Sequence, residues 1–486
     1  LVFILSCGGG GGGGSAPTPV ISQTPTPPAP PPTQSYEELK AQYEGYYQYQ
    51  SQWGLDMVNA STAYARGATG SGVTIGITDS GLDSTHKEIS ITRLSGDSDL
   101  SYSNYTPNTR QQRHGTMVAS VAAGTQETTD ASPMHGVAFD ANILFVAIQL
   151  AEPDPDYDPV DLGDDDGAGT VSNAPDFTGI DTFFSSLFGV YNQFDVDIVN
   201  NSYGYSGNII DYTEAQVRNA FPRTIAEMSQ IGTPDSQKTI YVWAAGNAGG
   251  YADQGVDFSS PELLAGMAYY IPEIQGHSIA VASIDENGSI SSFSNRCGIA
   301  QDYCISAPGG EITVAYPTST SDTGIYPEDP TDENYSRCVL DNSCFAVANG
   351  TSFAAPFVSG GLAVIAGYFE GQLGSTEIIE RLFVTANKTG IYSDKSIYGQ
   401  GLMDLGAATA PVGQVSAMLT GTLSGAMVPA FFTGIQLTSP SFGDAVSNGV
   451  ANQTVIFFDE LDAPFRGAIE NLTTDYRNQI VNLDGY

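Results

Sequence analysis

The stretch GVTIGITDSG, residues 72–81, decides the fold class of the chain. Its apolar, β-branched residues are typical of a buried strand, and the glycine that closes the stretch indicates a turn. The predicted strand therefore carries the carboxylate of Asp79 to its C-terminal end. An unpaired charge at such a position would be costly, so Asp79 either caps a turn or has a polar partner elsewhere in the chain.

Further segments predict buried strands with helices between them. The strand segments are ANILFVAIQL (141–150), VDIVNNSYG (196–204), TIYVWAAGN (239–247) and SIAVASI (278–284). The helical segments include HGTMVASVAAG (114–124) and DYTEAQVRNAFPRTIAEMSQIG (211–232). This alternation indicates an α/β fold of three layers, in which helices cover both faces of a mostly parallel sheet. Functional groups gather at the carboxyl ends of such strands, where Asp79, Asn201, Ser202 and Asn247 fall.

The charge of the chain is strongly one-sided, since 16 Lys and Arg stand against 54 Asp and Glu, a net charge of −38. Such a surface repels phosphate backbones, so we expect no nucleic-acid partner. The acidic segment 152–169 is predicted to be a solvated loop, because it lacks the ligand spacing of an EF-hand. We expect no required cofactor and no metal site, with a structural Ca²⁺ as the alternative. No membrane-spanning segment is predicted, because Gly, Ser, Thr and Pro interrupt the uncharged region 411–442.

Four of the five cysteines form two close pairs, in CGIAQDYC and CVLDNSC. The pairs are Cys297 with Cys304 and Cys338 with Cys344. Neither pair has the spacing of a zinc site and no histidine lies near them. Two local disulfides in an oxidising compartment are therefore favoured over free thiols.

The fifth cysteine, Cys7, lies between the apolar run LVFILS and a glycine-rich tail. This arrangement resembles the lipobox of a bacterial lipoprotein signal peptide, without its charged n-region. Residues 1–7 are predicted to be the end of a truncated signal peptide, with Cys7 as the lipidation site; a chance cysteine is the alternative. Residues 8–35 are predicted to be a disordered Gly- and Pro-rich spacer, and residues 36–69 a peripheral helical extension.

The segment NGTSFAAPFVSGG, residues 349–361, offers Ser352 either as the N-cap of a helix or as a nucleophile. Pro356 would fall in the first helical turn, where its missing N–H costs little. A serine hydroxyl is a weak nucleophile, so catalysis would need a positioned base and a group that orients the base.

His114 is the candidate base, because it begins a buried helix of small residues, and Asp79 is the candidate orienting group. Asn247, in VWAAGNAGG, could donate to an oxyanion together with the backbone N–H of Ser352. The other histidines are predicted to lack a catalytic role. His86 and His135 are expected on the surface in loops, and His277 as a structural residue before a strand.

Four segments, GITDSGLD, HGTMVAS, AAGN and GTSFAAPFVSGG, resemble in content and order the signature segments of the subtilisin-like serine proteases (peptidase S8). The order Asp, His, Ser is that of subtilisin and differs from the orders of chymotrypsin and the α/β-hydrolases. The resemblance implies a subtilisin-like peptidase domain over residues 70–410. It implies a catalytic triad of Asp79, His114 and Ser352, with Asn247 as oxyanion donor.

The segment NNSYG resembles the part of these enzymes that pairs with an extended substrate. That likeness implicates Ser202, Tyr203 and Gly204 in substrate binding. Polypeptides are the implied substrates, and we expect a monomer.

The flanking segments AYARGATGSGVTIGITDSGLD and YGQGLMDLGAATAPVG, with the lipobox-like leader, resemble passenger domains of Gram-negative autotransporters, some of which are lipoproteins. SFGDAVSNGVANQTVIFFDELDAPF resembles the junction that precedes the translocating barrel there. Residues 411–486 are therefore predicted to be a C-terminal linker or junction, too short for the barrel itself. The implied location is outside the cell, lipid-anchored to the outer membrane or at the cell surface of a Gram-negative bacterium, or released from it.

Two alternatives to a surface-anchored serine endopeptidase with an acyl-enzyme intermediate remain open. One is a catalytically silent, peptide-binding surface lipoprotein, which would not need four functional residues. The other is a serine esterase on the same fold.

Overall fold

A computed structural model describes ten ranges of the chain: 34–89, 114–127, 132–147, 178–204, 207–230, 239–316, 337–338, 344–418, 427–429 and 454–468. Cys7, nearly all of the predicted spacer and the acidic segment 152–169 lie outside these described residues.

A six-stranded sheet forms the centre of the molecule, in the order β2-β1-β3-β4-β5-β6, and every pairing in it is parallel. The strands are β1 Thr74–Asp79, β2 Asn142–Ala147, β3 Ile198–Asn201, β4 Ile240–Ala244, β5 Ser278–Ile284 and β6 Cys304–Pro308. The prediction of a mostly parallel α/β sheet is confirmed, and β6 is an addition to the predicted strands. The chain runs from β1 outward to β2 and then returns to the other side of β1, so the strand order reverses beside β1. Binding sites of open parallel sheets lie at the carboxyl ends of the strands next to such a reversal.

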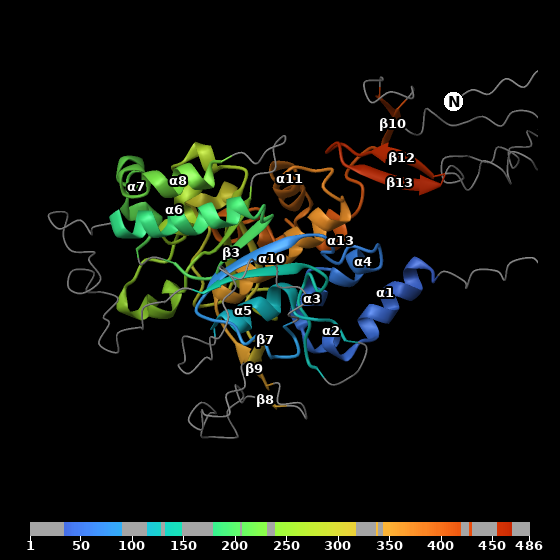
Figure 1. Cartoon of the computed structure of the whole chain (residues 1–486), viewed down its shortest axis with the longest axis horizontal. Helices are drawn as coiled ribbons and strands as arrows, with labels where there is room; N and C mark the ends of the chain where they lie inside the picture. The colour runs from blue at the N-terminus through green and yellow to red at the C-terminus, as the bar shows by residue number, and fades with distance from the viewer. Residues whose placement is uncertain are drawn as a thin grey trace, which may run out of the picture.

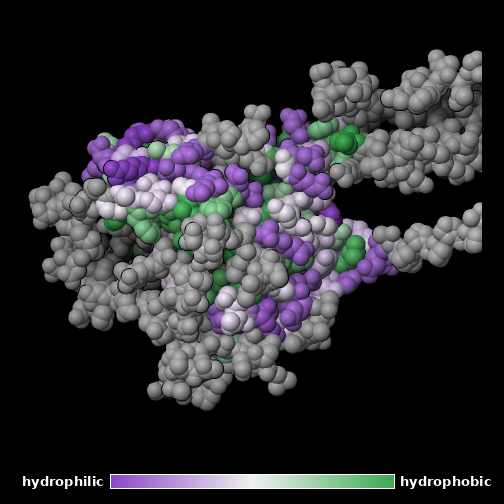
Figure 2. All heavy atoms as spheres, viewed as in Figure 1, coloured by the Kyte–Doolittle hydropathy of each residue, from purple (hydrophilic) through white to green (hydrophobic). Residues whose placement is uncertain are grey.

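Helices cover both faces of this sheet, as the side chains of β4 illustrate. Ile240, Val242 and Ala244 belong to one buried cluster, together with residues of α5 (His114–Ala123) and α10 (Thr351–Tyr368). Tyr241 and Trp243 point the other way, into a second cluster. That cluster includes residues of α6 (Thr178–Gln193), α7 (Glu214–Ala220) and α8 (Pro222–Met228), which lie together on one side of the molecule (Figure 1). Figure 2 shows hydrophilic residues over the outer surface of this helical layer.

Four N-terminal helices precede the sheet: α1 Tyr36–Gly45, α2 Tyr47–Ser51, α3 Trp53–Met57 and α4 Ala60–Tyr64. Side chains of α2, α3 and α4 join the first core cluster, since Tyr49, Leu55 and Tyr64 are at most 3% exposed, whereas α1 has no buried residue. Tyr64 also donates a hydrogen bond to the backbone oxygen of Val137 (2.7 Å). The segment is therefore packed into the domain and is not peripheral as expected.

Two smaller antiparallel sheets flank the domain. One has the order β7-β9-β8, and the other has the order β11-β10-β12-β13. Their strands are β7 Ile312–Tyr316, β8 Arg337–Cys338, β9 Cys344–Ala348, β10 Ser416–Met418, β11 Met427–Pro429, β12 Thr454–Phe458 and β13 Pro464–Ala468. The remaining α-helices are α9 Leu263–Gly266, α11 Ser375–Thr385, α12 Lys395–Tyr398 and α13 Leu405–Ala408. Short 3₁₀ helices are η3 Ile209–Asp211, η4 Ala248–Gln254, η5 Met267–Tyr269, η6 Pro272–Ile274, η7 Gly298–Tyr303 and η8 Gly390–Ser393.

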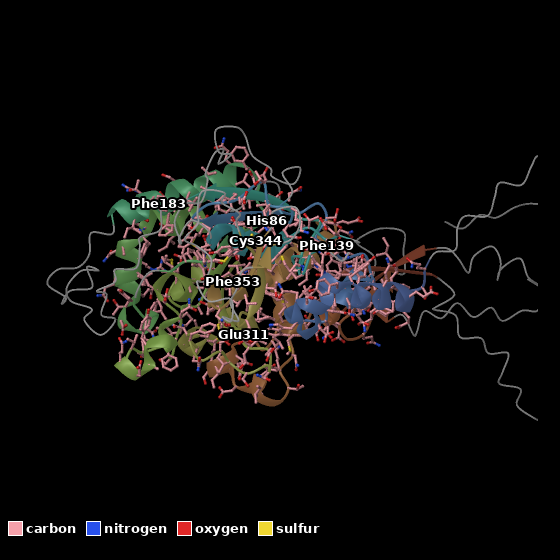
Figure 3. The ribbon with its side chains drawn as sticks, turned by 90° about the horizontal axis from the view of Figure 1, so that it is seen from below. His86, Phe139, Phe183, Glu311, Cys344 and Phe353 are labelled. Atoms are coloured by element: carbon pink, nitrogen blue, oxygen red, sulfur yellow. A yellow bond between two sulfur atoms is a disulfide. The ribbon has the colours of Figure 1, made fainter. Side chains whose placement is uncertain are left out.

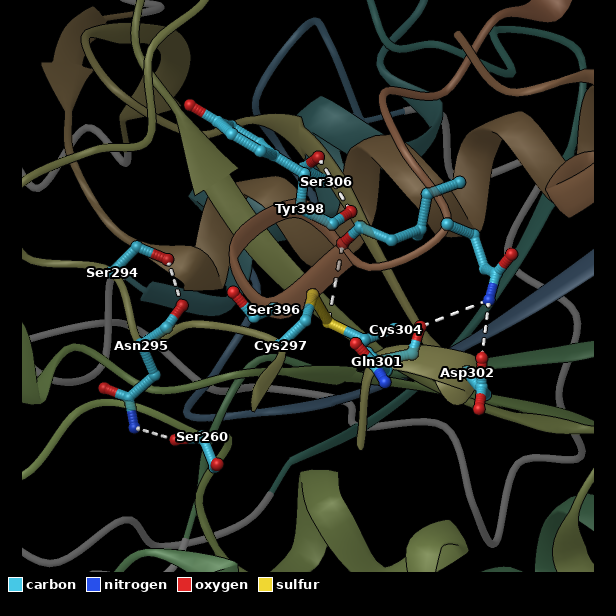
Figure 4. The surroundings of a disulfide bond; sticks show 12 residues. Ser260, Ser294, Asn295, Cys297, Gln301, Asp302, Cys304, Ser306, Ser396 and Tyr398 are labelled. Carbon is cyan, nitrogen blue, oxygen red and sulfur yellow. Dashed lines mark hydrogen bonds between the residues drawn. A yellow bond between two sulfur atoms is a disulfide. The ribbon is translucent and has the colours of Figure 1, made fainter. Parts of the chain in front are cut away.

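A disulfide joins Cys297 to Cys304, with a Cα–Cα distance of 5.6 Å, and closes the loop that leads into β6 (Figure 4). This pairing confirms one of the two predicted disulfides. Cys344 is also disulfide-bonded, and the register of β8 and β9 sets the backbone of Cys338 opposite it. The side chain of Cys338 lies outside the described residues, so its pairing stays a prediction.

Helix α10 is the one helix of the described residues that is long and apolar enough to cross a bilayer. Most of its residues are buried against the sheet and α5, which identifies it as the core helix of this domain.

Candidate active site

Asp79 and His114 meet at the carboxyl end of β1. Asp79 is the last residue of the strand and its side chain is fully buried, whereas His114, the first residue of α5, keeps 22% of its side chain exposed. The Nδ1 atom of His114 lies 2.9 Å and 3.0 Å from the two carboxylate oxygens of Asp79. Because a carboxylate accepts hydrogen bonds, this contact assigns the proton to Nδ1 and leaves Nε2 as an acceptor.

The close approach of α5 to this strand end depends on Gly115. A Cβ atom built on Gly115 would lie 2.3 Å from the backbone oxygen of Gly81, so no other residue fits without moving the helix. Burial lowers the pKa of His114, but the attraction of Asp79 and the hydrogen bond between them outweigh burial, and the net pKa is raised from its ordinary value.

Ser352 lies at the start of α10, which begins at Thr351. The N-cap is Gly350, at a φ of 156° that favours glycine, so the alternative of Ser352 as N-cap is wrong. Ser352 is the second helical residue, and its N–H is one of the four at a helix start that have no partner within the helix. That N–H is therefore left for a ligand, which is what an oxyanion donor requires.

Pro356 lies inside α10, not in its first turn as predicted. Its missing N–H would otherwise bond the backbone oxygen of Ser352, four residues earlier. That oxygen instead accepts a hydrogen bond from the Ser202 hydroxyl, which follows β3 (2.7 Å). The proline thus leaves the backbone oxygen of Ser352 free to accept a hydrogen bond from the residue that follows β3.

The hydroxyl of Ser352 donates to the backbone oxygen of Ser202 (3.2 Å). Among the residues that the structure describes, it makes no hydrogen bond to His114. The next residue of the helix, Phe353, does contact His114, with 5.6 Å between the ring centroids. Figure 3 labels Phe353 near the middle of the domain. A turn of the Ser352 side chain about its Cα–Cβ bond would redirect the hydroxyl.

Asn247 follows β4 and is exposed. Its Oδ1 atom accepts hydrogen bonds from the backbone N–H and the hydroxyl of Thr351, at 2.9 Å and 3.0 Å. With the oxygen held by two donors, the amide is oriented and its NH₂ group is the end left for a ligand. The contact of Thr351 with Asn247 was not predicted. The sequence shows only that Thr351, a residue with a hydroxyl donor, precedes Ser352.

Residues 202–204 continue β3 beyond the sheet. Gly204 is exposed, whereas the Tyr203 hydroxyl donates to Asn201 (2.8 Å) and its ring stacks on Phe184 (6.0 Å). The side chain of Tyr203 is therefore occupied within the domain, and a substrate would meet the backbone of this segment.

Asn200 is a further polar residue that sequence reasoning missed. Its amide nitrogen donates to the Ser202 hydroxyl, and its amide oxygen accepts from Ser359 of α10, both at 2.9 Å. The available signal was an asparagine inside the apolar strand segment DIVNN, since a buried amide needs partners.

His86 and His135 are 2% and 1% exposed, so their prediction as surface residues is wrong. His86 Nε2 lies 2.9 Å from the backbone oxygen of Cys344, and Figure 3 shows the two residues side by side. Burial lowers the pKa of His135 to about 4, which keeps this imidazole neutral. His277, predicted to be structural, is buried and contacts the backbone oxygen of Met228 (3.0 Å).

No group of three or more His, Cys, Asp and Glu side chains that could hold a metal ion occurs among the described residues. The arrangement at the ends of β1, β3 and β4 combines an oriented imidazole, a hydroxyl and two N–H donors. Those groups can activate a hydroxyl nucleophile and stabilise negative charge on an oxygen.

Comparisons with known proteins identify the family of the chain. The model of the subtilase family (peptidase S8) matches residues 70–401. An "Extracellular serine protease" of Serratia marcescens is 27% identical over 396 residues, covering 74% of this chain and 33% of the relative, so this chain spans about a third of that relative. "Subtilisin DY" of Bacillus licheniformis is 26% identical over 356 residues, covering 73% of this chain and 97% of the relative.

The solved structure of MycP1 from the ESX-1 type VII secretion system matches at 20% identity with a TM-score of 0.47, covering 74% of this chain and 86% of that one. The family model alone spans more than half of the sequence and includes Asp79, His114 and Ser352: the chain belongs to the subtilase family of serine proteases.

Proposed function

We propose that this chain is a serine endopeptidase that cleaves polypeptides through an acyl-enzyme, with Ser352 as nucleophile. The observation that carries the proposal is the contact of His114 Nδ1 with Asp79 at 2.9 Å, beside a helix start that presents Ser352. Membership in the subtilase family supports the same assignment.

In the proposed reaction, the Ser352 hydroxyl turns from the backbone oxygen of Ser202 toward Nε2 of His114. His114 takes the hydroxyl proton as the Ser352 oxygen attacks the scissile carbonyl carbon, and Asp79 stabilises the imidazolium that forms. His114 then gives this proton to the leaving amine, and water releases the acyl group by the reverse sequence of proton transfers.

The carbonyl oxygen gains negative charge during both attacks. We assign its stabilisation to the NH₂ group of Asn247 and the backbone N–H of Ser352. Thr351 is the positioning residue of this pair, because its N–H and hydroxyl both hold the amide oxygen of Asn247. The exposed backbone at Gly204 would bind the substrate as an added strand.

We further propose that the enzyme acts outside the cell of a Gram-negative bacterium, lipid-anchored through Cys7 at the outer membrane or cell surface. The lipobox-like leader and the name of the Serratia relative support this location. The proposal also includes polypeptides as substrates, a monomeric state and no required cofactor.

A fluorophosphonate probe tests the nucleophile directly. We expect the probe to label the chain at Ser352 and to leave Ser352→Ala unlabelled, with a loss of turnover of about 10⁶-fold. Asn247→Ala should still be labelled, and its turnover should fall by about 10²–10³-fold, the loss measured for the corresponding donor in subtilisin. A folded protein that takes no label would overturn the proposal in favour of a silent peptide-binding protein. Rapid turnover of a simple ester without cleavage of casein would instead indicate an esterase.

A further inference from the structure

Glu262 is a partly buried carboxylate that the proposed mechanism does not use. Its backbone N–H donates to the oxygen of Ala245 (2.9 Å), and its backbone also bridges to Asn208, so the residue is held beside the end of β4. Its carboxylate has no hydrogen bond or ion pair to any other side chain among the described residues. The nearby backbone N–H of Asn247 is the one polar group that stabilises its charge.

The carboxylate lies between two glycines that follow neighbouring strands. A Cβ atom built on Gly204, after β3, would lie 1.8 Å from Oε2 of Glu262, and one built on Gly246, after β4, would lie 2.5 Å from Oε1. For both glycines, the nearest atoms that such a Cβ would meet all belong to Glu262. Gly246 also has a φ of 114°, so a side chain there would be strained whatever the space. The carboxylate of Glu262 therefore lies against the backbone of both segments.

Both segments also make hydrogen bonds to the start of α10, where Ser352 lies. Ser202, two residues before Gly204, accepts the hydrogen bond of the Ser352 hydroxyl. Gly246 donates its N–H to the hydroxyl of Thr351 (3.2 Å) and immediately precedes Asn247. A substrate residue whose carbonyl carbon sits at Ser352 and whose oxygen faces Asn247 would lie beside both segments, and therefore near Glu262.

A carboxylate without a cationic partner is costly in a partly buried position. Burial raises the pKa of Glu262 to about 8, although the N–H of Asn247 opposes the shift. A cation that enters this space would remove the cost and form a charge-assisted hydrogen bond. No described residue supplies a cation to Glu262, and a basic side chain of a bound substrate would supply one.

We infer that Glu262 lines the subsite for the residue on the N-terminal side of the scissile bond and selects Arg or Lys there. The inference rests on the proposed endopeptidase function, because it needs Ser352 and Asn247 to define where that residue lies. It names the substrate class: polypeptides cut after basic residues.

The test uses a matched series of peptide p-nitroanilides that differ only in the residue before the scissile bond: Arg, Lys, Gln, Ala and Phe. Assays at pH 9 keep the Glu262 carboxyl ionised and the substrate Lys protonated. We expect kcat/KM to be highest for Arg or Lys. Glu262→Gln, which keeps the shape of the side chain, should lower kcat/KM for these two by about 10–100-fold. The same change should alter kcat/KM for Gln and Ala by less than about threefold.

Two controls separate charge at the site from other effects. Asp253→Asn removes one negative charge from an exposed residue of η4, and it should leave the preference unchanged. An uncharged fluorophosphonate should still label Ser352 in Glu262→Gln, which would show that the variant is folded and active. A second readout without turnover is benzamidine, a small cation, which should protect Ser352 from labelling at least 10-fold less well in Glu262→Gln.

The two proposals fail differently. If the probe does not label Ser352 and no peptide is cleaved, the endopeptidase proposal itself is overturned. If labelling and cleavage occur but neutral residues are preferred, or if Glu262→Gln leaves the preference for Arg and Lys unchanged, the assignment of Glu262 is overturned and the protease assignment stands.

Discussion

At the scale of single residues, hydrogen bonds stabilise the buried charge of Asp79, and one of their donors is His114, the proposed general base. The backbone N–H of Ser80 donates to Asp79 Oδ1 (2.6 Å), and His114 Nδ1 contacts both carboxylate oxygens. The charge of Asp79 and its hydrogen bond with His114 raise the pKa of His114 above its ordinary value, against the effect of burial. A general base must be neutral to accept a proton, so kcat/KM should rise with pH through a midpoint above about 6.5, the ordinary value for histidine.

Asp79→Asn tests this coupling. The change removes the negative charge that raises the pKa of His114. Burial, which lowers this pKa, then acts without an opposing charge. We expect kcat/KM to fall by about 10⁴-fold, and the acid limb of the residual activity to move to lower pH. A pH profile from 5 to 10 for both proteins measures the two effects. An acid limb that stays at the same pH would show that His114 is not the group that titrates.

Residues of the site differed in how far the sequence could predict them. Asp79, His114, Asn247 and Ser352 lie in local patterns that combine a strand end or a helix start with a polar residue, and the structure brings them to one edge of the sheet. Glu262 had no such pattern. It is a single acidic residue in a loop, and its neighbours are two glycines that lie 58 and 16 positions away in the chain. Only the folded chain shows what surrounds it.

At the scale of elements, the same distinction holds. The strands β1 to β5 are apolar runs that the sequence marks locally, and each predicted segment contains the observed strand. β6, with the sequence CISAP, mixes polar and apolar residues and ends in proline, so it carries no clear local signal. β7 and β9 pair with each other across residues 317–343, which no local pattern reveals. In α10, the predicted position of Pro356 depended on which residue is the N-cap. Because the N-cap is Gly350 and not Ser352, the helix begins earlier and Pro356 lies beyond its first turn.

Pro356→Ala tests the function of the proline within this element. The new N–H would compete for the Ser352 backbone oxygen with the Ser202 hydroxyl, so we expect kcat to fall by about fivefold, the equivalent of one modest hydrogen bond. Ser202→Ala removes the same contact from the other side and should reduce kcat to a similar extent. The free energy of unfolding of Pro356→Ala should stay level or rise, since alanine is the better helix residue. An unchanged kcat in Pro356→Ala, with a reduced kcat in Ser202→Ala, would contradict a role for the proline.

At the scale of the whole molecule, a buried ion pair ties the C-terminal strands to the domain. Arg381 of α11 pairs with Asp459, which follows β12, and both side chains are fully buried. The guanidinium packs on the rings of both Phe369 and Phe465, 4.9 Å and 5.5 Å from their centroids. Asp459 also accepts N–H groups from Val412, Leu461 and Ala463. Residues 454–468, inside the segment predicted to be a junction, are thus packed onto the peptidase domain.

Arg381→Met should show how much this attachment depends on charge. Methionine fills much of the same volume beside the two phenylalanine rings but leaves Asp459 buried without a cation, so we expect a loss of about 3–5 kcal/mol in the free energy of unfolding. Adding Asp459→Asn should recover part of that loss, because it removes the unpaired charge. Urea denaturation of the two single variants and the double variant measures the coupling. The pair lies near the C-terminal end of α10, about 24 Å along the helix from Ser352, so fluorophosphonate labelling should keep its rate. A loss below about 1 kcal/mol would mean that apolar packing of the β12–β13 hairpin, and not the ion pair, holds the C-terminal strands in place.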